Sequence, residues 1–466
     1  MERKWWVLLA AGIGTFMSAL DTSVVNIVLP VVNRDFGSDV ATIEWVVTIY
    51  LLVVSGLLLS FGRLGDLRGN KPIYVFGFAL FVTGSALCGQ APNEFSLIGF
   101  RAFQALGAAM IFANAPAILT KNFPPEQRGQ ALGLQGMMTY LGLTVGPSLG
   151  GWLTTQFSWR AVFYINIPVG LLALLLSQRV IPLDPPKENV ERFDLAGAAT
   201  FMTGLVLLLL VLNQGHEWGW TSPLVLSLAV VALLALGVFL FVERRVQMPM
   251  LDLSLFRVRL FSAAVTSAVL NYVCLYSVLF LMPFYLIQGR GLSTDQAGLL
   301  LTAQPLVMAF AAPLSGTLSD RIGSRLPGTL GMAILAVGLF MLSRLGFTSP
   351  QSDIVVWLGV VGLGTGIFVS PNSSALMGAA PQHRQGIAAG ILATARNVGM
   401  VLGVGLAGAI FTTVQSAGAG SDANTALISG IQAGWLVAAG VAALGALASA
   451  MRGGGENNVR VAISPK

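Results

Sequence analysis

Two similar pentapeptides, 254 residues apart, decide the fold of this chain. GRLGD at Gly62–Asp66 follows one long apolar run, and GTLSD at Gly316–Asp320 follows another. At an offset of 256, PEQR at Pro125–Arg128 corresponds to PQHR at Pro381–Arg384. Similar sequences that recur at nearly one offset indicate an internal duplication of a large structural unit.

The composition places most of this duplicated chain in lipid. Of its 466 residues 55% are hydrophobic and 10% are charged, with a mean hydropathy of +0.78, whereas a soluble domain has about 25% charged residues. A bilayer-spanning helix needs about 20 mainly apolar residues. Fourteen runs meet that length: Trp5–Val32, Glu44–Gly62, Pro72–Ala91, Phe95–Leu119, Arg128–Leu153, Trp159–Arg179, Asp194–Asn213, Ser222–Val242, Leu260–Ile287, Gln296–Leu318, Leu326–Arg344, Asp353–Met377, Arg384–Phe411 and Leu427–Ala450.

The sequence therefore predicts an all-α polytopic membrane protein with 14 transmembrane helices. The runs are too long and too continuously apolar for barrel strands, which alternate over about ten residues. The repeat pairs spans one to six with spans nine to fourteen, which leaves spans seven and eight as an inserted hairpin. We predict a six-helix bundle at 1–180, the hairpin with its flanking loops at 181–259, a second bundle at 260–451 and a disordered tail at 452–466.

The basic residues predict the orientation in the membrane. If the N-terminus is cytoplasmic, 20 of the 26 Lys and Arg residues fall in inner segments and four in outer segments. This bias follows the positive-inside rule. We expect a multi-pass protein of the inner (plasma) membrane with both termini in the cytoplasm. The net charge of +6 is explained by topology and does not require a nucleic-acid partner.

The sequence gives little indication of disulfide, metal-binding or catalytic chemistry. Cys88 and Cys274 lie inside apolar runs, and His216 and His383 stand alone in loops. These positions suggest neither a disulfide nor a metal site. We find no nucleotide-binding loop and no catalytic constellation, so neither an enzyme nor an ATP-driven pump is expected, and no cofactor is expected beyond the proton-motive force.

Four motifs resemble a known family. Gly62–Lys71 (GRLGDLRGNK) is similar to the loop signature of the major facilitator superfamily, with departures at Leu67 and Asn70, where the family usually has Arg. Leu20–Pro30 (LDTSVVNIVLP) and Trp159–Pro168 (WRAVFYINIP) are similar to motifs of spans one and six in its fourteen-span drug:proton antiporters. This resemblance implies the major facilitator fold, two six-helix bundles plus two inserted helices, which agrees with the parallel repeat.

The fourth motif, GPSLGG at Gly146–Gly151, resembles the antiporter motif of span five. Gly142, Gly146 and Gly150 recur every four residues and form a stripe on one helix face, while Pro147 and Gly151 complete the motif. Small residues let helix backbones approach closely. The stripe either provides tight packing alone or forms an interface that slides or seals during transport.

Asp21 is the carboxylate that lies well inside a predicted span. A charge in the membrane is costly and indicates function, and the resemblance implies proton coupling at this position. Arg101 lies about 9 Å from the outer end of span four, and Asp21 about 24 Å from the inner end of span one. Both fall in the outer half of the bilayer, so we predict that they interact when Asp21 is ionised and separate when it is protonated. The alternatives are a helix-terminal or pore-lining polar role for Asp21 and a structural Arg101 that packs against carbonyl groups.

Other polar positions are candidates for a substrate cavity. Arg396 in span thirteen meets substrate, closes the central cavity against Asp21 or bonds to carbonyl groups, and we group it with the coupling residues. Glu44 is better explained as an interfacial residue, and Trp45 either belongs to the aromatic belt or lines the cavity. The candidate cavity residues are Asn26, Glu44, Trp45, Tyr50 and Gln104.

Charged residues at the ends of spans two and ten are candidates for a cytoplasmic gate. Asp66 has two compatible interpretations, a cap on the helix that follows it and a latch between the two halves. The residues of this predicted gate are Gly62, Asp66, Arg68, Gly69, Lys71, Asp320 and Arg321.

The function predicted from these features is proton-coupled export of lipophilic or cationic small molecules by alternating access. An exporter of an anionic or zwitterionic metabolite or lipid is an alternative, because Arg101 and Arg396 outnumber Asp21 within the spans. A membrane sensor or scaffold that only binds its ligand is a third possibility. The expected partners are a small-molecule substrate, protons and membrane lipid; a monomer is the working expectation, and sodium is an alternative to protons.

Overall fold

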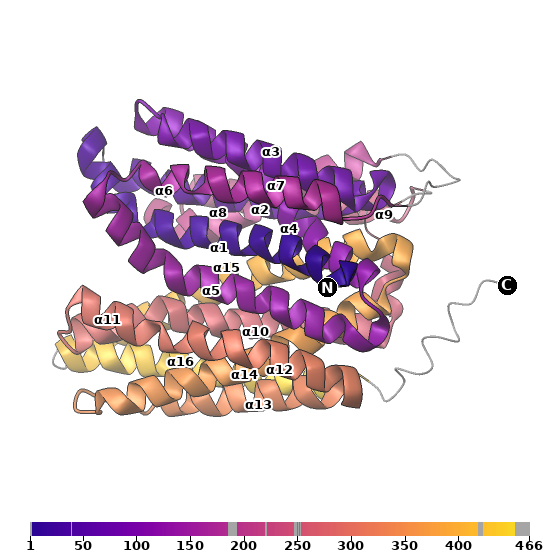
Figure 1. The fold of residues 1–466 in the computed structure, drawn as a ribbon. Helices are drawn as coiled ribbons and strands as arrows, with labels where there is room; N and C mark the ends of the chain where they lie inside the picture. Colours follow the sequence, from indigo (N-terminus) through magenta and orange to yellow (C-terminus); the bar gives the residue numbers. More distant parts are fainter. Residues whose placement is uncertain are drawn as a thin grey trace. The chain divides into compact units, whose positions relative to one another are not determined.

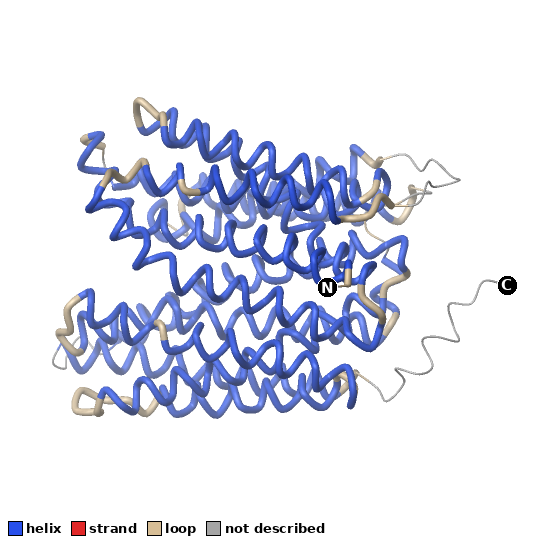
Figure 2. Tube along the Cα trace, viewed as in Figure 1, coloured by secondary structure: helices blue, strands red, loops and turns tan. Residues whose placement is uncertain are grey.

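The computed structural model describes residues 2–38, 40–184, 193–219, 221–246, 249, 251, 253–417 and 423–452. Throughout these ranges the regular elements are helices, without a strand among them (Figure 2). They group into two compact units, of residues 1–125, 138–254 and 380–394, and of residues 126–137, 255–379 and 395–466. The predicted hairpin segment thus groups with the first unit as far as Ser254. The predicted boundaries at 180, 259 and 451 stay a prediction.

The first unit contains α1 to α9, apart from residues 126–137, which group with the second unit. The elements are α1 (Arg3–Phe36), α2 (Val40–Arg68), α3 (Asn70–Gly89), α4 (Glu94–Asn122), η1 (Pro125–Gln127), α5 (Arg128–Gln156), α6 (Ala161–Tyr164), α7 (Asn166–Val180), α8 (Leu195–Trp218) and α9 (Pro223–Glu243). Helix α3 packs on α4 and α7, and α2 packs on α4 (Figure 1). A β-carbon on Gly107 would lie 2.5 Å from the backbone nitrogen of Phe81. Glycine there allows the backbones of α3 and α4 to touch.

Two local sequence features determine where α4, α6 and α7 begin or end. The side chain of Asn93 accepts a hydrogen bond from the backbone N–H of Ser96 at 2.8 Å and so caps α4. The sixth predicted span is divided into α6 and α7 at Ile165. Pro168 lacks the N–H that would bond to the carbonyl of Tyr164, and its ring crowds that carbonyl. Helix α6 accordingly ends at Tyr164, and Asn166 begins α7.

The predicted hairpin, α8 and α9, forms one layer of the first unit. Helix α9 packs on α8, and α8 packs on α2, where Met202 and Val206 lie against Gly56. The rest of α9 is apolar and open, with exposed side chains at Leu224, Leu226, Val230, Val231, Leu233 and Leu234. A helix that is apolar all round and exposed outside its packing face is typical of a membrane span.

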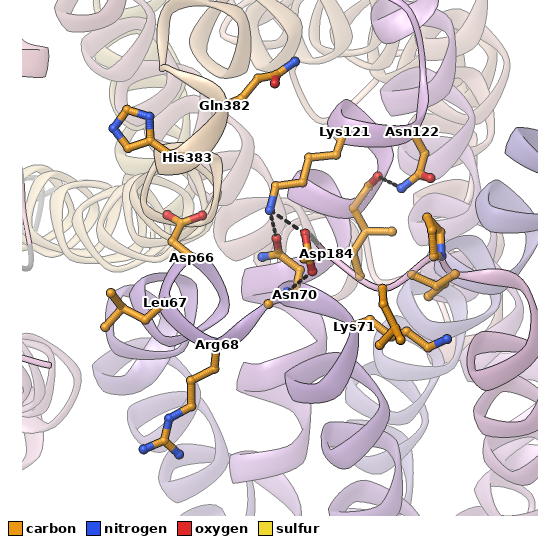
Figure 3. Close-up of a pocket in the computed structure, with 15 residues that line it drawn as sticks. Asp66, Leu67, Arg68, Asn70, Lys71, Lys121, Asn122, Asp184, Gln382 and His383 are labelled. Atoms are coloured by element: carbon orange, nitrogen blue, oxygen red, sulfur yellow. Dashed lines mark hydrogen bonds and ion pairs between the residues drawn. The ribbon is translucent and has the colours of Figure 1, made fainter. Parts of the chain in front are cut away.

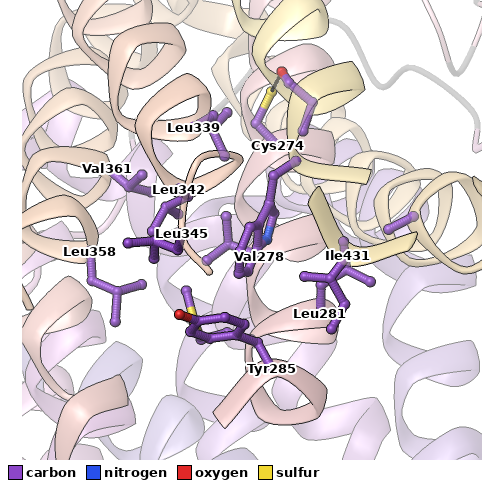
Figure 4. Packing of buried hydrophobic residues seen from close by; sticks show 14 of the residues in the cluster. Cys274, Val278, Leu281, Tyr285, Leu339, Leu342, Leu345, Leu358, Val361 and Ile431 are labelled. Atoms are coloured by element: carbon purple, nitrogen blue, oxygen red, sulfur yellow. Dashed lines mark hydrogen bonds between the residues drawn. The ribbon is translucent and has the colours of Figure 1, made fainter. Parts of the chain in front are cut away.

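The second unit contains the remaining helices. They are η2 (Leu253–Arg257), α10 (Arg259–Pro283), η3 (Phe284–Gly289), α11 (Thr294–Leu301), α12 (Ala303–Ile322), α13 (Arg325–Leu342), α14 (Gln351–Ala379), η4 (Gln382–Arg384), α15 (Gln385–Ala417) and α16 (Ala423–Ala450). The division of residues among units assigns η4 and the beginning of α15 to the first unit. Side chains of α10, α13, α14 and α16, among them Val278, Leu339, Leu358 and Ile431, form a continuous apolar core (Figure 4).

Thirteen helices in the described part of the chain are long and apolar enough to span a membrane. Helix α5, the fifth predicted span, is 29 residues long, or about 44 Å at 1.5 Å per residue. It is not among these thirteen because the glycine, threonine and glutamine residues that recur along it make it less apolar. The chain is a multi-pass helical membrane protein, and the fourteenth span stays a prediction.

Arg452, the first residue of the predicted tail, has contacts with α14. Arg452 is 3% exposed and donates a hydrogen bond to Oδ1 of Asn372 on α14. Its guanidinium carbon also lies 5.7 Å from the ring centre of Phe368. These contacts attach Arg452 to the second unit. The rest of the predicted tail, residues 453–466, lies outside the described residues.

Candidate transport site

A buried ion pair joins α1 and α4 in the first unit. Nη1 of Arg101 lies 2.7 Å from Oδ2 of Asp21, and each residue is 1% exposed. The contact agrees with the depth of the two residues estimated from the sequence. Ionised groups with so little access to water need strong partners, because the desolvation of each ion is costly.

Two amides complete the coordination of the carboxylate. Nε2 of Gln104 donates to Oδ1 of Asp21 at 3.0 Å, and Nδ2 of Asn166 donates to the same oxygen at 2.8 Å. Gln104 also donates to Oγ of Ser85 at 2.7 Å. Hydrogen bonds to an ionised acceptor are about twice as strong as neutral ones. The carboxylate thus accepts hydrogen bonds from α4 and α7 while it belongs to α1.

Arg101 has partners besides Asp21. It donates from Nη1 to Oε1 of Gln104 at 2.7 Å and from Nε to the carbonyl of Val46 at 3.2 Å. Its guanidinium carbon lies 4.1 Å from the ring centre of Tyr50 and 5.9 Å from that of Phe163, within range of cation–π attraction. Tyr50 and Gln104, which the sequence suggested for a substrate cavity, belong to this buried cluster, at 2% and 0% exposure, and their role in a cavity stays a prediction.

Sequence reasoning did not single out Asn166 or Ser85. Asn166 is 1% exposed and begins α7 directly after the break, so Pro168 fixes the place from which its amide reaches Asp21. A lone polar residue in the otherwise apolar stretch before Pro168 was the available signal. Ser85 is 0% exposed on α3, and no feature of the sequence distinguished it from a serine packed inside a helix.

The antiporter-motif glycines pack against α1 beside Asp21. A β-carbon on Gly142 would lie 2.6 Å from the carbonyl oxygen of Phe16, and one on Gly146 would lie 1.8 Å from Oγ of Ser23. One on Gly150 would lie 3.0 Å from Cγ1 of Val24. The glycine stripe is therefore a close helix contact around the residues that flank Asp21. Gly151 is on another face, where a β-carbon would have no neighbour within 4 Å. Pro147 lies inside α5.

Two repeat-related carboxylates cap distant helices. Asp66, at the end of α2, accepts hydrogen bonds from the backbone N–H groups of Gly386 and Ile387 in α15, both at 2.8 Å. Asp320, at the end of α12, accepts from Gly129 and Gln130 in α5 at 2.8 and 2.9 Å. Both carboxylates thus lie at helix N-termini, where the helix dipole favours negative charge. The internal duplication is visible in these hydrogen bonds.

The predicted cap by Asp66 on the following helix is wrong. The cap on α3 is Asp184, whose Oδ2 accepts from the backbone N–H of Asn70 at 2.6 Å. Gly69 precedes α3 with φ of 94°, a conformation that favours glycine. The helix after Asp66 is thus capped from the segment that follows α7.

A cavity of about 550 Å³ surrounds this cap. Lys121 donates to Oδ1 of Asp184 at 2.9 Å and to Oδ1 of Asn70 (Figure 3), and Asn70 donates to Oδ1 of Asn114 at 2.8 Å. Asn70, a departure from the family motif, is thus a buried member of this network. Lys121 is 20 residues from Arg101 on α4, about 30 Å along the helix. The cavity is separate from the ion-pair cluster.

The remaining predicted site residues are less enclosed. Glu44 and Asn26 are exposed, and Trp45 and Arg396 are partly buried. At the helix ends Lys71 donates to the carbonyl of Gln178 at 2.8 Å. Arg68 and Arg321 are exposed, and Gly62 would place a β-carbon 2.2 Å from the carbonyl oxygen of Gly386. Among the described residues no group of three or more His, Cys, Asp or Glu residues is arranged to hold a metal ion.

The architecture is that of a membrane carrier. It combines many apolar helices, a buried ion-paired carboxylate and two capping carboxylates related by the internal repeat. The family model of the Major Facilitator Superfamily matches residues 11–404 and, in a second match, residues 264–453. This chain belongs to the Major Facilitator Superfamily.

Relatives and a solved structure agree with this assignment. The chain is 36% identical over 411 residues to the riboflavin transporter RibZ of Clostridioides difficile (strain 630). The aligned residues cover 88% of this chain and 89% of the relative. It is 33% identical over 413 residues to the multidrug resistance protein Stp of Mycobacterium tuberculosis (strain CDC 1551 / Oshkosh), with 88% and 76% covered. The crystal structure of the human organic anion transporter MFSD10 (TETRAN) has the same fold, with a TM-score of 0.69 at 17% identity, covering 96% of this chain and 100% of that one.

Proposed function

We propose that this chain is a proton-coupled secondary antiporter that exports lipophilic small molecules across the inner membrane by alternating access. The observation that carries the proposal is the Asp21 carboxylate, enclosed at 1% exposure by Arg101, Gln104 and Asn166. A carboxylate is a group that can take up and release one proton in each transport cycle. We assign the coupling proton to Asp21.

The partners of Arg101 support a cycle in which the ion pair opens. When Asp21 takes up a proton, Arg101 still has Oε1 of Gln104, the carbonyl of Val46 and the Tyr50 ring. A buried arginine without such partners would resist the loss of its counterion, because an uncompensated buried charge costs about 3–5 kcal/mol. We propose that protonation of Asp21 releases α1 from α4 while Arg101 stays in place.

The glycine contact between α1 and α5 supports transmission of that release. Gly142 and Gly146 contact α1 on either side of Asp21 in sequence, at Phe16 and at Ser23. The small residues of the stripe let the backbones of α1 and α5 approach closely at these positions. We propose that this interface couples the protonation of Asp21 to the movement of α5.

The duplicated caps support a gate. We propose that Asp66, bonded to α15, and Asp320, bonded to α5, hold the cytoplasmic side closed in one state and release it in the other. Each accepts two backbone hydrogen bonds from a helix N-terminus. Both termini of the chain are then cytoplasmic, as the distribution of basic residues predicts.

The relatives support a small organic substrate. One is a riboflavin transporter and the other a multidrug resistance protein; riboflavin is a planar aromatic molecule. Lipophilic cations, as the sequence suggests, and anionic or zwitterionic metabolites are both compatible with this class. A sensor or scaffold is disfavoured because a protein that only binds its ligand has no need of a coupling carboxylate.

Proton release tests the proposal. Everted membrane vesicles with the parent protein should release protons when an aromatic substrate, either a cation such as ethidium or an anion, is added, and vesicles with Asp21→Asn should not. Asp35→Asn is the matched control, because Asp35 is a carboxylate on the same helix that pairs with Arg160 at 3.1 Å and is exposed. An Asp21→Asn variant as active as the parent would exclude Asp21 as the proton carrier.

A further inference from the structure

A cationic and aromatic cluster lies where α10 and α15 meet in the second unit. Arg396 on α15 is close enough to the phenol groups of Tyr272 and Tyr276 on α10 to interact with both electrostatically. All three side chains are partly buried and partly open. Neither Tyr272 nor Tyr276 was among the site residues predicted from the sequence.

The backbone geometry brings these side chains together. Gly399 lies three residues after Arg396, so the two share one face of α15. A β-carbon on Gly399 would lie 2.7 Å from Cβ of Tyr272, so the helices touch there. Tyr276 follows Tyr272 by four residues and lies on the same face of α10. The cluster is therefore fixed by a close helix contact.

The cluster lies near the middle of its spans. Arg396 is 11 residues from the beginning of α15 and Tyr272 is 13 residues from the beginning of α10, which places them about 17 and 20 Å along their helices. The hydrocarbon core is about 30 Å thick. An arginine at that depth is costly in lipid and normally faces a water-filled cavity or the bundle interior. The open part of Arg396 therefore faces water or a ligand.

The charges around the cluster favour an acceptor as its ligand. The described carboxylates of the second unit lie at helix ends or in a turn, at Glu126, Asp320 and Asp353. Within the second unit, the charged group of this cluster is thus the guanidinium of Arg396.

We propose that Arg396, Tyr272 and Tyr276 bind the transported molecule, and that this molecule is a planar aromatic compound with an anionic or carbonyl-type acceptor group. The guanidinium pairs with the acceptor in a planar, bidentate geometry, the tyrosine rings contact the aromatic face, and their hydroxyl groups donate to further acceptors. This inference rests on the proposed export function and deepens it by naming the substrate class.

Two dyes with the same ring system and opposite charge test the substrate class. Carboxyfluorescein is an anionic xanthene and rhodamine 123 a cationic one. Uptake of each dye into proteoliposomes with an acidic interior is measured by filtration, with the dye quantified after lysis at one fixed alkaline pH. Binding is measured separately by fluorescence anisotropy on the purified protein in nanodiscs. The inference predicts tighter binding and faster gradient-driven uptake of carboxyfluorescein.

Variants of the cluster locate the recognition. Arg396→Gln should weaken carboxyfluorescein binding roughly 10- to 100-fold, the effect of losing a hydrogen bond to a charged group. Arg396→Lys should recover part of this loss because it retains the charge. Tyr272→Phe and Tyr276→Phe remove only hydroxyl groups and should give smaller losses. Arg344→Gln, an exposed arginine of the same unit beside Phe340, is the matched control and should bind as the parent does.

The outcomes separate this inference from the proposed function. Binding of rhodamine 123 in preference to carboxyfluorescein, binding of neither dye, or unchanged carboxyfluorescein binding in Arg396→Gln would overturn the substrate assignment. Carboxyfluorescein binding that depends on Arg396 without gradient-driven uptake would support the binding site and refute antiport. Gradient-driven uptake of rhodamine 123 alone would support antiport and refute this binding site.

Discussion

The sharpest structural prediction concerns two glycines of α5 that differ in their surroundings. A β-carbon on Gly146 would lie 1.8 Å from Oγ and 2.9 Å from Cβ of Ser23, whereas one on Gly151 would have no neighbour within 4 Å. Oγ of Ser23 already donates to the carbonyls of Leu20 and Gly142, at 3.1 and 3.3 Å. Gly146→Ala therefore forces Ser23 to rotate or α5 to move away from α1.

The magnitude follows from the comparison of the two variants. Replacement of glycine by alanine inside a helix stabilises it by about 0.8–1.0 kcal/mol, and this gain is common to both. Overpacking of a well-packed contact costs about 1–3 kcal/mol, and this penalty applies to Gly146→Ala alone. Gly146→Ala should therefore be about 1–3 kcal/mol less stable than Gly151→Ala.

The assay is thermal unfolding of purified parent and variants in one detergent, followed by tryptophan fluorescence. Transport by Gly146→Ala should also fall, because the displaced contact lies beside Asp21, while Gly151→Ala should transport as the parent does. Adding Ser23→Ala to Gly146→Ala should recover part of the stability, since the closest overlap is with Oγ. Equal stability and transport for the two single variants would refute the idea that the glycine stripe packs against α1.

Three further predictions concern polar contacts. Asn166→Leu removes a hydrogen bond to the Asp21 carboxylate and should lower the free energy of unfolding by about 1.5–3 kcal/mol, measured by thermal unfolding. Asp184→Asn weakens the partly buried pair with Lys121 and should cost about 1 kcal/mol, less at high salt, in the same assay. Hydrogen bonds from Trp159 and Arg160 hold the pKa of Asp35 below its usual value. The stability from Asp35 is thus fully present above about pH 3.9 and is lost as pH falls through its lower folded pKa, which acid titration of unfolding will show.

Each of these predictions has a control. Asn122→Leu removes an amide that bonds within its own helix, to the carbonyl of Ile118, and should cost less than Asn166→Leu. Asp353→Asn changes a partly buried carboxylate at the beginning of α14 and should not acquire the salt dependence expected for Asp184→Asn. Trp159→Phe should reduce the acid-dependent loss of stability; an unchanged titration would mean that Trp159 does not stabilise the ionised form of Asp35.

The pairing of Asp21 with Arg101 was predictable because helix geometry converts sequence position into depth. With 1.5 Å per residue and a core of about 30 Å, two charges on different spans are assigned to the same level from their numbers alone. The partners at that level were not predictable. Asn166 reaches Asp21 because α6 ends at Tyr164, and the side on which α7 then lies depends on packing.

The cap at Asp66 shows the opposite case. A carboxylate near the beginning of α3 was a reasonable cap for that helix, yet Asp66 bonds to Gly386 and Ile387, 320 and 321 residues away. The N-terminus of α3 is instead capped by Asp184. Local sequence identifies a residue that can cap, but the helix that it caps depends on which N-terminus the fold brings near.

The sequence by itself determined the solvent, the number and length of most helices, the duplication and the presence of a membrane-buried charge. These properties depend on the composition of the chain and on the spacing of its apolar and charged residues, both of which are contained in the linear sequence. The tertiary structure decided the amides that enclose Asp21, the contact of Gly146 with Ser23 and the cluster of Arg396 with two tyrosines. Those contacts depend on the rotation of each helix about its axis, which is set by side chains of several helices packing at once.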